Sequence, residues 1–290
     1  MKRILIVGSK GMAGHMLRQF LIEYKTFEVI DISRDDEFFK SNYSLDLSDL
    51  EQLNRILEIE KPDIIVNCVG ILNQVAEANP ERSIFINSFI PHFLAGRCKR
   101  LIHISTDCVF NGIKGNYVES DHKDGLGYYA ESKSLGEVTY GPHLTIRTSI
   151  IGPELKSNGG GLLHWFLNQS GEIKGYSNAL WTGVTTLQLA KFIKDLIDKP
   201  EITGLVHYTN NIKISKLNIL KLISLVFNKK ISIIPSEDYH VDKSLENTRT
   251  DVDFVIPGYE TMIRELFDFI CNHRDRLYRQ YYPDVSPPKD

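Results

Sequence analysis

Short apolar runs alternate with longer amphipathic segments through the first half of this chain. The runs are rich in isoleucine and valine and predict strands over residues 4–7, 27–32, 64–69, 101–104 and 144–151. Between them, apolar residues recur every three or four positions, which predicts helices over 12–24, 50–57, 83–98 and 129–138. Pro91 should kink the third of these helices. Strands that alternate with helices predict a parallel sheet covered on both faces.

The regular alternation stops after Gly152-Pro153. The glycines of 158–161 predict a flexible connection, and the three prolines of 283–290 predict a loose tail. Between these segments, the pattern predicts a helix over 217–227, a strand over 231–234 and an amphipathic helix over 258–278. We expect one domain over residues 1–151 and a smaller α/β lobe formed mainly by 152–290, with some of its segments returning to the first domain.

Composition and charge exclude several classes of protein. Of the 290 residues, 42% are hydrophobic and 24% are charged, and the net charge of −3 leaves no basic stripe for nucleic acid. The apolar runs are too short to span a membrane, and the first one is too short for a signal peptide. The four cysteines lack metal-ligand spacing, so we expect no metal site and reduced thiols in a cytoplasm.

A glycine-rich turn joins the first predicted strand to the first predicted helix. Gly8, Gly11 and Gly14 follow a GxxGxxG spacing, which differs from the more usual GxGxxG. Glycines here let the backbone approach a pyrophosphate, whose charge the helix N-terminus stabilises. The turn therefore predicts a dinucleotide site that includes Lys10 and Met12, although a simple strand–helix turn would also need glycine.

The end of the second predicted strand bears on the choice of cofactor. NAD calls for an acidic side chain there, whereas NADP favours hydroxyl and basic groups. We expect Ser33 to occupy the position, followed by Arg34, and this favours NADPH. If the register were shifted by two residues, Asp31 would take the position and NADH would be the cofactor. Five residues that follow later strands are further cofactor candidates, although they could equally serve only to form turns: Asp46, Leu47, Cys68, Val69 and Gly70.

A tyrosine, a lysine and a hydroxyl form a candidate proton-transfer site. Tyr129 and Lys133 lie four residues apart on a predicted helix, so the ammonium should lower the pKa of the phenol and reach the cofactor ribose. Thr106, after the strand over 101–104, should hold a substrate carbonyl. Ser105 competes for that role, but consecutive strand residues face opposite ways. A second YxxxK at 239–243 has no preceding strand and hydroxyl, and is interpreted as a surface feature.

These segments resemble the extended short-chain dehydrogenase/reductase superfamily, and within it the dTDP-4-dehydrorhamnose reductase-like group. The resemblance rests on the glycine turn, Pro62–Asn67, Ser105–Gly112 and Tyr129-x-x-x-Lys133 followed by Gly136-Glu137. It implies a Rossmann-type doubly wound parallel sheet that binds NAD(P), with a smaller α/β substrate-binding lobe. It also implies reduction of the 4-keto group of a nucleotide-linked 6-deoxysugar, with Thr106, Tyr129 and Lys133 as the catalytic residues. Related enzymes often form homodimers, although no stretch here identifies an interface.

Two departures bear on the substrate. Cys108 stands where the group commonly has tyrosine, and residues 68–73 differ from the usual alanine-rich stretch. A UDP-linked N-acetylated 4-keto sugar is therefore a second candidate substrate. The related dehydratases have glutamate at the position of Cys108, and a thiol is a poor general acid for their reaction. A 4-epimerase keeps the same three residues, and a regulatory subunit like that of methionine adenosyltransferase remains the non-catalytic alternative.

Four residues outside the triad are candidates for binding the substrate. Arg147 and Arg249 could grip a diphosphate, because guanidinium groups bind phosphate oxygens in pairs; the alternative for each is a surface ion pair. Trp181 could stack on the base or sugar, but core packing is the more common use of such an aromatic side chain. Asp107 follows the candidate hydroxyl directly and completes the set.

Overall fold

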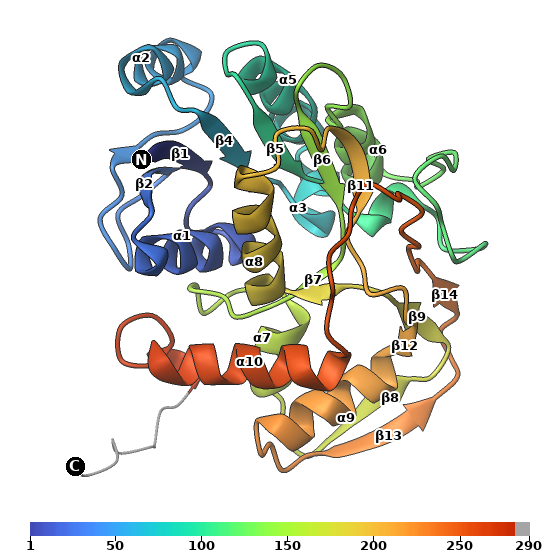
Figure 1. Ribbon diagram of the computed structural model, residues 1–290. Helices are drawn as coiled ribbons and strands as arrows, with labels where there is room; N and C mark the ends of the chain where they lie inside the picture. The colour runs from blue at the N-terminus through green and yellow to red at the C-terminus, as the bar shows by residue number, and fades with distance from the viewer. Residues whose placement is uncertain (282–290) are drawn as a thin grey trace.

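The computed structural model describes residues 1–281, so the tail expected over 283–290 lies outside it. Within the described residues, seven parallel strands form one sheet (Figure 1). In spatial order they are β11 (Gly204–His207), β6 (Leu144–Arg147), β5 (Leu101–Ile104), β4 (Ile64–Asn67), β1 (Lys2–Val7), β2 (Phe27–Ser33) and β3 (Tyr43–Ser44). The carboxyl ends of all these strands meet at one edge, where ligands of such sheets gather.

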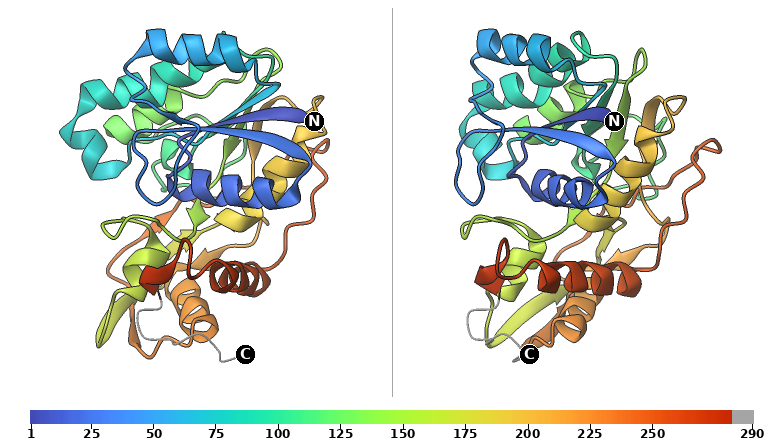
Figure 2. Two further views of the ribbon diagram at one scale, coloured as in Figure 1. Left: turned by 90° about the vertical axis from the view of Figure 1, so that its left-hand side faces the viewer. Right: turned by 60° about the vertical axis from the view of Figure 1, so that its left-hand side comes forward.

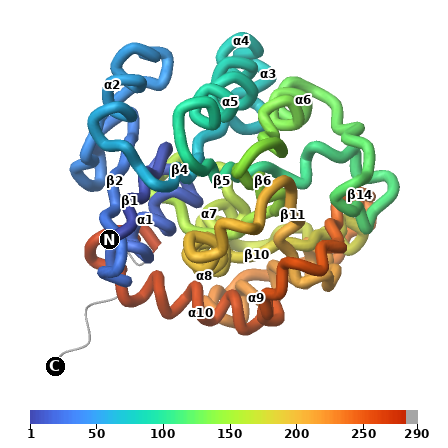
Figure 3. Tube along the Cα trace, turned by 45° about the horizontal axis from the view of Figure 1, so that its top comes forward, coloured from blue at the N-terminus to red at the C-terminus, as the bar shows by residue number. Residues whose placement is uncertain are grey.

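Helices cover both faces of the sheet (Figure 3). The alternating residues of β1 show this, since Ile4 and Ile6 pack into one apolar core and Leu5 and Val7 into the other. The first core contains α1 (Met12–Tyr24) and α8 (Thr186–Ile197). The second contains α2 (Leu50–Glu60) and α5 (Ile90–Ala95). The expected doubly wound α/β fold is confirmed.

The helix expected over 83–98 has a different internal structure. After α3 (Asn73–Ala78), the chain forms α4 (Pro80–Ser83), a π-helical turn η1 (Ile84–Phe89) and α5. Pro91 has no N–H, so the carbonyl of Asn87 receives no helical hydrogen bond from it. Gly136 lies against that carbonyl, and a Cβ on Gly136 would be 1.8 Å from the oxygen. In place of the expected kink, the chain forms the wider π-helical turn. Gly136, at the end of a later helix, packs closely against it.

The strand expected over 144–151 is in fact two strands in different sheets. β6 ends at Arg147, and β7 (Ile150–Ile151) pairs with β10 (Val184–Thr185). Between them, the Thr148 hydroxyl donates to the carbonyl of Tyr208 at 2.8 Å. The chain leaves the main sheet at this point. A continuous apolar run does not reveal such an exchange, because both strands are equally apolar.

The remaining elements form a lobe next to the carboxyl edge of the sheet (Figure 2). Its helices are α7 (Leu162–Leu167), α9 (Lys216–Val226) and α10 (Tyr259–Asn272), so the last helix ends earlier than expected. Its strands are β8 (Glu172–Tyr176), β9 (Ala179–Trp181), β12 (Ile214–Ser215), β13 (Ser232–Ser236) and β14 (Val241–Asp242). β11 and α8, although late in the sequence, lie with the main sheet. No helix in residues 1–281 has the length and apolar character needed to cross a membrane.

Candidate active site

Two glycines of the first turn are required by the protein itself. Gly8 has φ +88°, and a Cβ on it would lie 2.6 Å from a methyl carbon of Val69. A Cβ on Gly14 would lie 2.1 Å from the carbonyl oxygen of Gly8, which is well inside van der Waals contact. Because both glycines lack a Cβ, α1 can pack closely against the end of β1.

Gly11 differs from these two glycines. It is exposed at the N-cap of α1, and the nearest atom to a Cβ there would be 3.4 Å away, at the carbonyl oxygen of Gly8. The protein therefore leaves room for a side chain at this position. No side chain caps the N-terminus of α1, so its exposed amides suit a phosphate group. The packing of the protein does not require a glycine at position 11, but the close approach of a bound pyrophosphate would. A pyrophosphate-binding turn needs such a glycine.

The end of β2 separates the two candidates for ribose recognition. Asp31 is buried and already bonded, because it accepts 2.6 Å from the Ser9 hydroxyl and lies 3.2 Å from the guanidinium of Arg18. Ser33 ends the strand, and its hydroxyl is 2.7 Å from that of Ser41. Arg34 is exposed, and among the described residues no carboxylate lies within ion-pair distance of it. The side chain of Lys10 is buried nearby and donates to the carbonyl of Asp35.

The other cofactor candidates have different surroundings. Asp46 accepts 3.0 Å from the Ser48 amide and 2.7 Å from Arg82, and these bonds lower its pKa to about 2. Leu47 is buried in the second core. Cys68 directly follows β4, and burial raises the pKa of its thiol to about 12. Cys68 lies near Lys133, which places it and the following Val69 and Gly70 between the glycine turn and the candidate triad.

Thr106 and Tyr129 meet just beyond the end of β5. The Thr106 hydroxyl accepts 3.1 Å from the Cys108 amide, which begins the short 3-10 turn η2 (Asp107–Val109). Tyr129 lies in α6 (Tyr128–Leu135), and its side chain lies close to Thr106, which acts on the pKa of the phenol. Ser105 faces the other way and donates to Glu137 at 2.8 Å. The alternation expected from the sequence therefore leaves Thr106 as the hydroxyl beside the tyrosine.

Lys133 lies one helical turn after the half-buried Tyr129 and is itself buried. Its ammonium donates to the Ile104 carbonyl at 2.7 Å, and burial lowers its pKa to about 8. The expected lowering of the Tyr129 pKa is wrong for this structure, because burial raises that pKa and the nearby Cys108 and Asp107 add to the rise. This half-buried phenol therefore keeps its proton at neutral pH.

Asn87 is a positioning residue that the sequence did not single out. Its amide nitrogen donates 3.0 Å to the Ser132 hydroxyl in α6 and 2.9 Å to the carbonyl of Ile71. Its amide oxygen accepts 2.8 Å from the N–H of Ile71. Asn87 thus ties the helix that carries Tyr129 to the loop after β4. A buried asparagine in an otherwise apolar helix is the sequence signal that could have revealed it.

Comparisons with known proteins assign the chain to a family. Its sequence matches the model of the RmlD substrate binding domain over residues 1–244. The chain belongs to this family. It is 33% identical to the dTDP-4-dehydrorhamnose reductase of Burkholderia thailandensis over 159 residues, which cover 51% of this chain and 50% of that protein. The resemblance recognised in the motifs is confirmed.

Two further comparisons mark the range of related proteins. The chain is 29% identical to methionine adenosyltransferase 2 subunit beta of Danio rerio over 146 residues, covering 47% of this chain and 42% of the relative. It thus spans about half the length of these curated relatives. The dTDP-4-dehydrorhamnose reductase of Bacillus anthracis, solved in complex with NADP, aligns with a TM-score of 0.79 over 93% of this chain and 99% of that chain. At 21% identity, this likeness establishes the fold.

In this family member, Arg147 is part of a buried ion pair. Its guanidinium donates to both carboxylate oxygens of Glu137, at 2.7 and 2.8 Å, and lies 3.1 Å from the His207 ring. Burial opposes ionisation of Glu137, but the bonds from Arg147 outweigh it and lower the carboxyl pKa. Because Ser105 also donates to Glu137, the pair holds the end of β5 in place. Arg147 therefore forms an ion pair, which was the alternative to a phosphate ligand. The pair lies in the interior and not at the surface.

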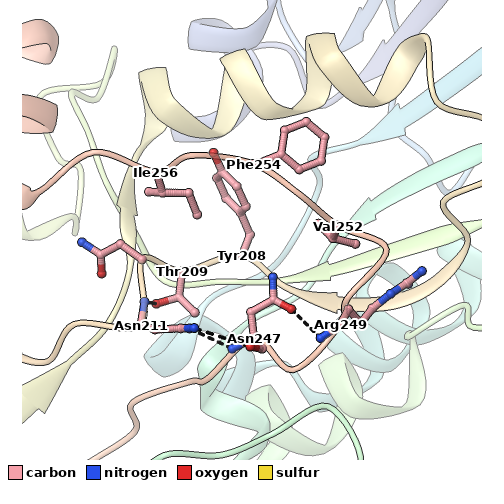
Figure 4. Close-up of a pocket in the computed structure, with 9 residues that line it drawn as sticks. Tyr208, Thr209, Asn211, Asn247, Arg249, Val252, Phe254 and Ile256 are labelled. Carbon is pink, nitrogen blue, oxygen red and sulfur yellow. Dashed lines mark hydrogen bonds between the residues drawn. The ribbon is translucent and has the colours of Figure 1, made fainter.

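Arg249 is likewise bonded within the protein. Its guanidinium pairs with Asp251 and donates to the carbonyls of Thr203 and Leu205, which lie at the start of β11. It also lines a cavity of about 250 Å³ next to Asn211 and Asn247 (Figure 4). These bonds fasten the segment before α10 to the main sheet. The structure does not bring Arg249 together with Tyr129.

Trp181 and Asp107 lie on the lobe side of the triad. Trp181 is only 3% exposed and packs against Tyr259 at 5.7 Å between ring centroids, so it serves the core. Asp107 is buried next to Thr106, whose hydroxyl donates to it at 3.1 Å. Burial raises the pKa of Asp107, while Lys243 and Lys216 of the lobe oppose that rise. These two lysines were not among the candidates, and Lys243 belongs to the second YxxxK, so that motif is not wholly a surface feature.

The glycine turn gives a paired test. Gly11→Ala should weaken NADPH binding roughly tenfold, or about 1.4 kcal/mol, because the added methyl group occupies the ligand side of the turn. Its unfolding free energy should hardly change. Gly14→Ala should instead lower the unfolding free energy by about 1–3 kcal/mol through overpacking against Gly8. Fluorescence titration and urea unfolding measure the two effects, and equal effects of both substitutions on binding and stability would contradict this division of roles.

The buried pair gives a stability test. Glu137→Gln keeps the shape of the side chain but leaves the Arg147 charge uncompensated, so the unfolding free energy should fall by about 3–5 kcal/mol. Glu260→Gln, which removes one partner of an exposed pair with Arg264 on α10, is the matched control and should change little. Denaturant unfolding of both variants measures the difference, and similar losses would argue against a structural role for the buried pair.

Proposed function

We propose that this protein is an NADPH-dependent reductase of the 4-keto group of a nucleotide-linked 6-deoxysugar. The observation that carries the proposal is the half-buried Tyr129 close to Thr106, with Lys133 one turn away, at the sheet edge that also bears the glycine turn. Membership of the family and the reductase names of several relatives support the same reaction. In this proposal, residues 1–151 bind the cofactor and 152–290 mainly bind the substrate.

The chain offers a consistent set of residues for the cofactor. Gly8, Gly11 and Met12 would hold the diphosphate at the N-terminus of α1. Ser33 and Arg34 would hold the 2′-phosphate of NADPH, and the buried bonds of Asp31 remove the acidic group that NADH would need. Lys10, Lys133 and residues 68–70 complete the proposed site. The bound cofactor supplies the hydride that reduces the sugar carbonyl carbon.

The remaining chemistry belongs to the protein. The Thr106 hydroxyl, which donates to Asp107 in this structure, would turn its proton to the carbonyl oxygen and polarise it. Tyr129, whose pKa is raised by burial, would give its proton to that oxygen as negative charge develops there. Lys133 would then stabilise the phenolate, because its ammonium lies on the same face of α6. The bond from Lys133 to the Ile104 carbonyl holds the lysine in the place where it can do so.

The alternatives differ from this reductase in what they would need. A dehydratase requires an acid at position 108, which here is a half-buried thiol whose pKa burial raises to about 11. A non-catalytic subunit is the alternative that the likeness to methionine adenosyltransferase 2 subunit beta suggests. Such a subunit would not require all three triad residues. A 4-epimerase would use the same residues without net consumption of NADPH.

Replacement of the proposed proton donor tests the function. Tyr129→Phe should lower the turnover of a dTDP- or UDP-linked 4-keto-6-deoxysugar by roughly 10²–10⁴-fold, the usual contribution of general acid catalysis. The affinity for NADPH, measured by titration, should stay nearly the same, since the hydroxyl faces Thr106. The rate of NADPH oxidation reports turnover. An unchanged rate in Tyr129→Phe would show that another group donates the proton.

A further inference from the structure

Two lysines of the lobe lie near Asp107, the residue after Thr106. Lys216 is the first residue of α9, and Lys243 directly follows β14. Both act electrostatically on the buried carboxyl of Asp107, which adjoins Thr106. Figure 1 shows β14 beside β9, just below the loop that follows β5. The lobe therefore contributes positive charge to the region next to the proposed proton donor.

The position of Lys216 is set by an aromatic ring. Its ammonium lies 5.2 Å from the centroid of the buried Trp181 ring, a cation–π contact that keeps the side chain from folding back into solvent. Lys216 is half-buried, and burial lowers its pKa, with Asp107 and Cys108 as the groups that oppose the lowering. This lysine is thus held near Cys108, and so near the triad, at a cost in desolvation.

The position of Lys243 is set by the backbone on either side of it. The Asp242 amide donates to the Gly112 carbonyl at 2.8 Å, and the Ser244 carbonyl accepts from the Tyr117 amide at 2.8 Å. The backbone at Lys243 is therefore fixed against the loop after β5. The neighbouring carboxylate of Asp242 pairs with Lys213 and not with Lys243.

Neither lysine has a carboxylate partner of its own. Among residues 1–281, no acidic oxygen lies within 4 Å of the ammonium of Lys216 or Lys243, whereas Arg147 and Arg249 each pair with an acid. Two half-buried ammonium groups that face a single carboxyl leave an excess of positive charge. An anionic ligand would offset the cost of keeping them there.

We propose that Lys216 and Lys243 bind the substrate diphosphate at the end nearest the sugar. This inference rests on the proposed function, which puts the carbonyl at C4 of the sugar against Thr106 and Tyr129. In a pyranose ring, C1, which carries the diphosphate, lies across the ring from C4. An anion attached there points away from the triad toward the lobe, where the two lysines are. Lysine ammonium groups are common phosphate ligands, and two of them match the charge of a diphosphate.

The test is a binding measurement that needs no turnover. The full-length protein is titrated with dTDP and with UDP, and separately with NADPH, for the wild type, Lys216→Met and Lys243→Met. Lys221→Met is the matched control, because Lys221 is exposed on the same helix as Lys216. We expect each of the first two substitutions to weaken nucleoside diphosphate binding roughly tenfold or more, as loss of a charged hydrogen bond does. NADPH affinity should not change, and Lys216→Arg should retain most of the binding.

The outcomes separate this inference from the proposed function. If both Met variants bind dTDP and UDP as well as Lys221→Met does, the inference is overturned even for an active reductase. If NADPH affinity falls to the same degree, the lysines serve the cofactor or the fold, and the inference is equally overturned. If diphosphate binding depends on the lysines but no 4-keto sugar is reduced, the inference holds and the reductase proposal fails.

Discussion

Consecutive residues at the end of β5 point in opposite directions, and the arrangement of the site depends on that alternation. Ser105 points inward and joins the buried Glu137–Arg147 pair, which fixes the strand end against β6 and β11. Thr106 points to the carboxyl edge and meets the Tyr129 hydroxyl. The buried pair costs desolvation energy, and its strong bonds in turn allow little movement of the strand. The hydroxyl proposed to hold the substrate is thereby placed by a network that has no contact with the substrate.

A second polar connection places the other half of the site. Asn87 binds both Ser132 in α6 and the backbone of Ile71, so the helix with Tyr129 and the loop after β4 move together. The π-helical turn in front of Pro91 leaves the Asn87 carbonyl free of its helical bond, and Gly136 packs against it. The π-helical turn departs from regular helix geometry, and because Gly136 has no Cβ the end of α6 packs closely against it.

The sequence predicted the main sheet because its strands and helices are encoded locally. Strand β5 and helix α1 have the expected bounds, and the Tyr129–Lys133 spacing alone places both groups on one helix face.

The partners of long charged side chains could not be predicted in this way. Arg147 and Arg249 looked like phosphate ligands, yet each is paired with an acid or a carbonyl that only the folded chain brings near. Lys216 and Lys243 reach Asp107 from more than one hundred residues away, so no local pattern could reveal them. The exchange of sheets between β6 and β7 was hidden for the same reason, since β7 pairs with β10, which lies more than thirty residues later in the chain.

The central claim is that a hydride passes between a nicotinamide and the sugar C4 while Tyr129 supplies the proton. The most direct measurement uses NADPH that carries two deuterium atoms at C4 of the nicotinamide, together with a nucleotide-linked 4-keto-6-deoxysugar. The account predicts one deuterium at C4 of the sugar product for each NADPH oxidised, as seen by mass spectrometry and NMR. A sugar that carries no deuterium, with NADPH bound but not consumed, would contradict the account and leave an epimerase or a dinucleotide-binding subunit.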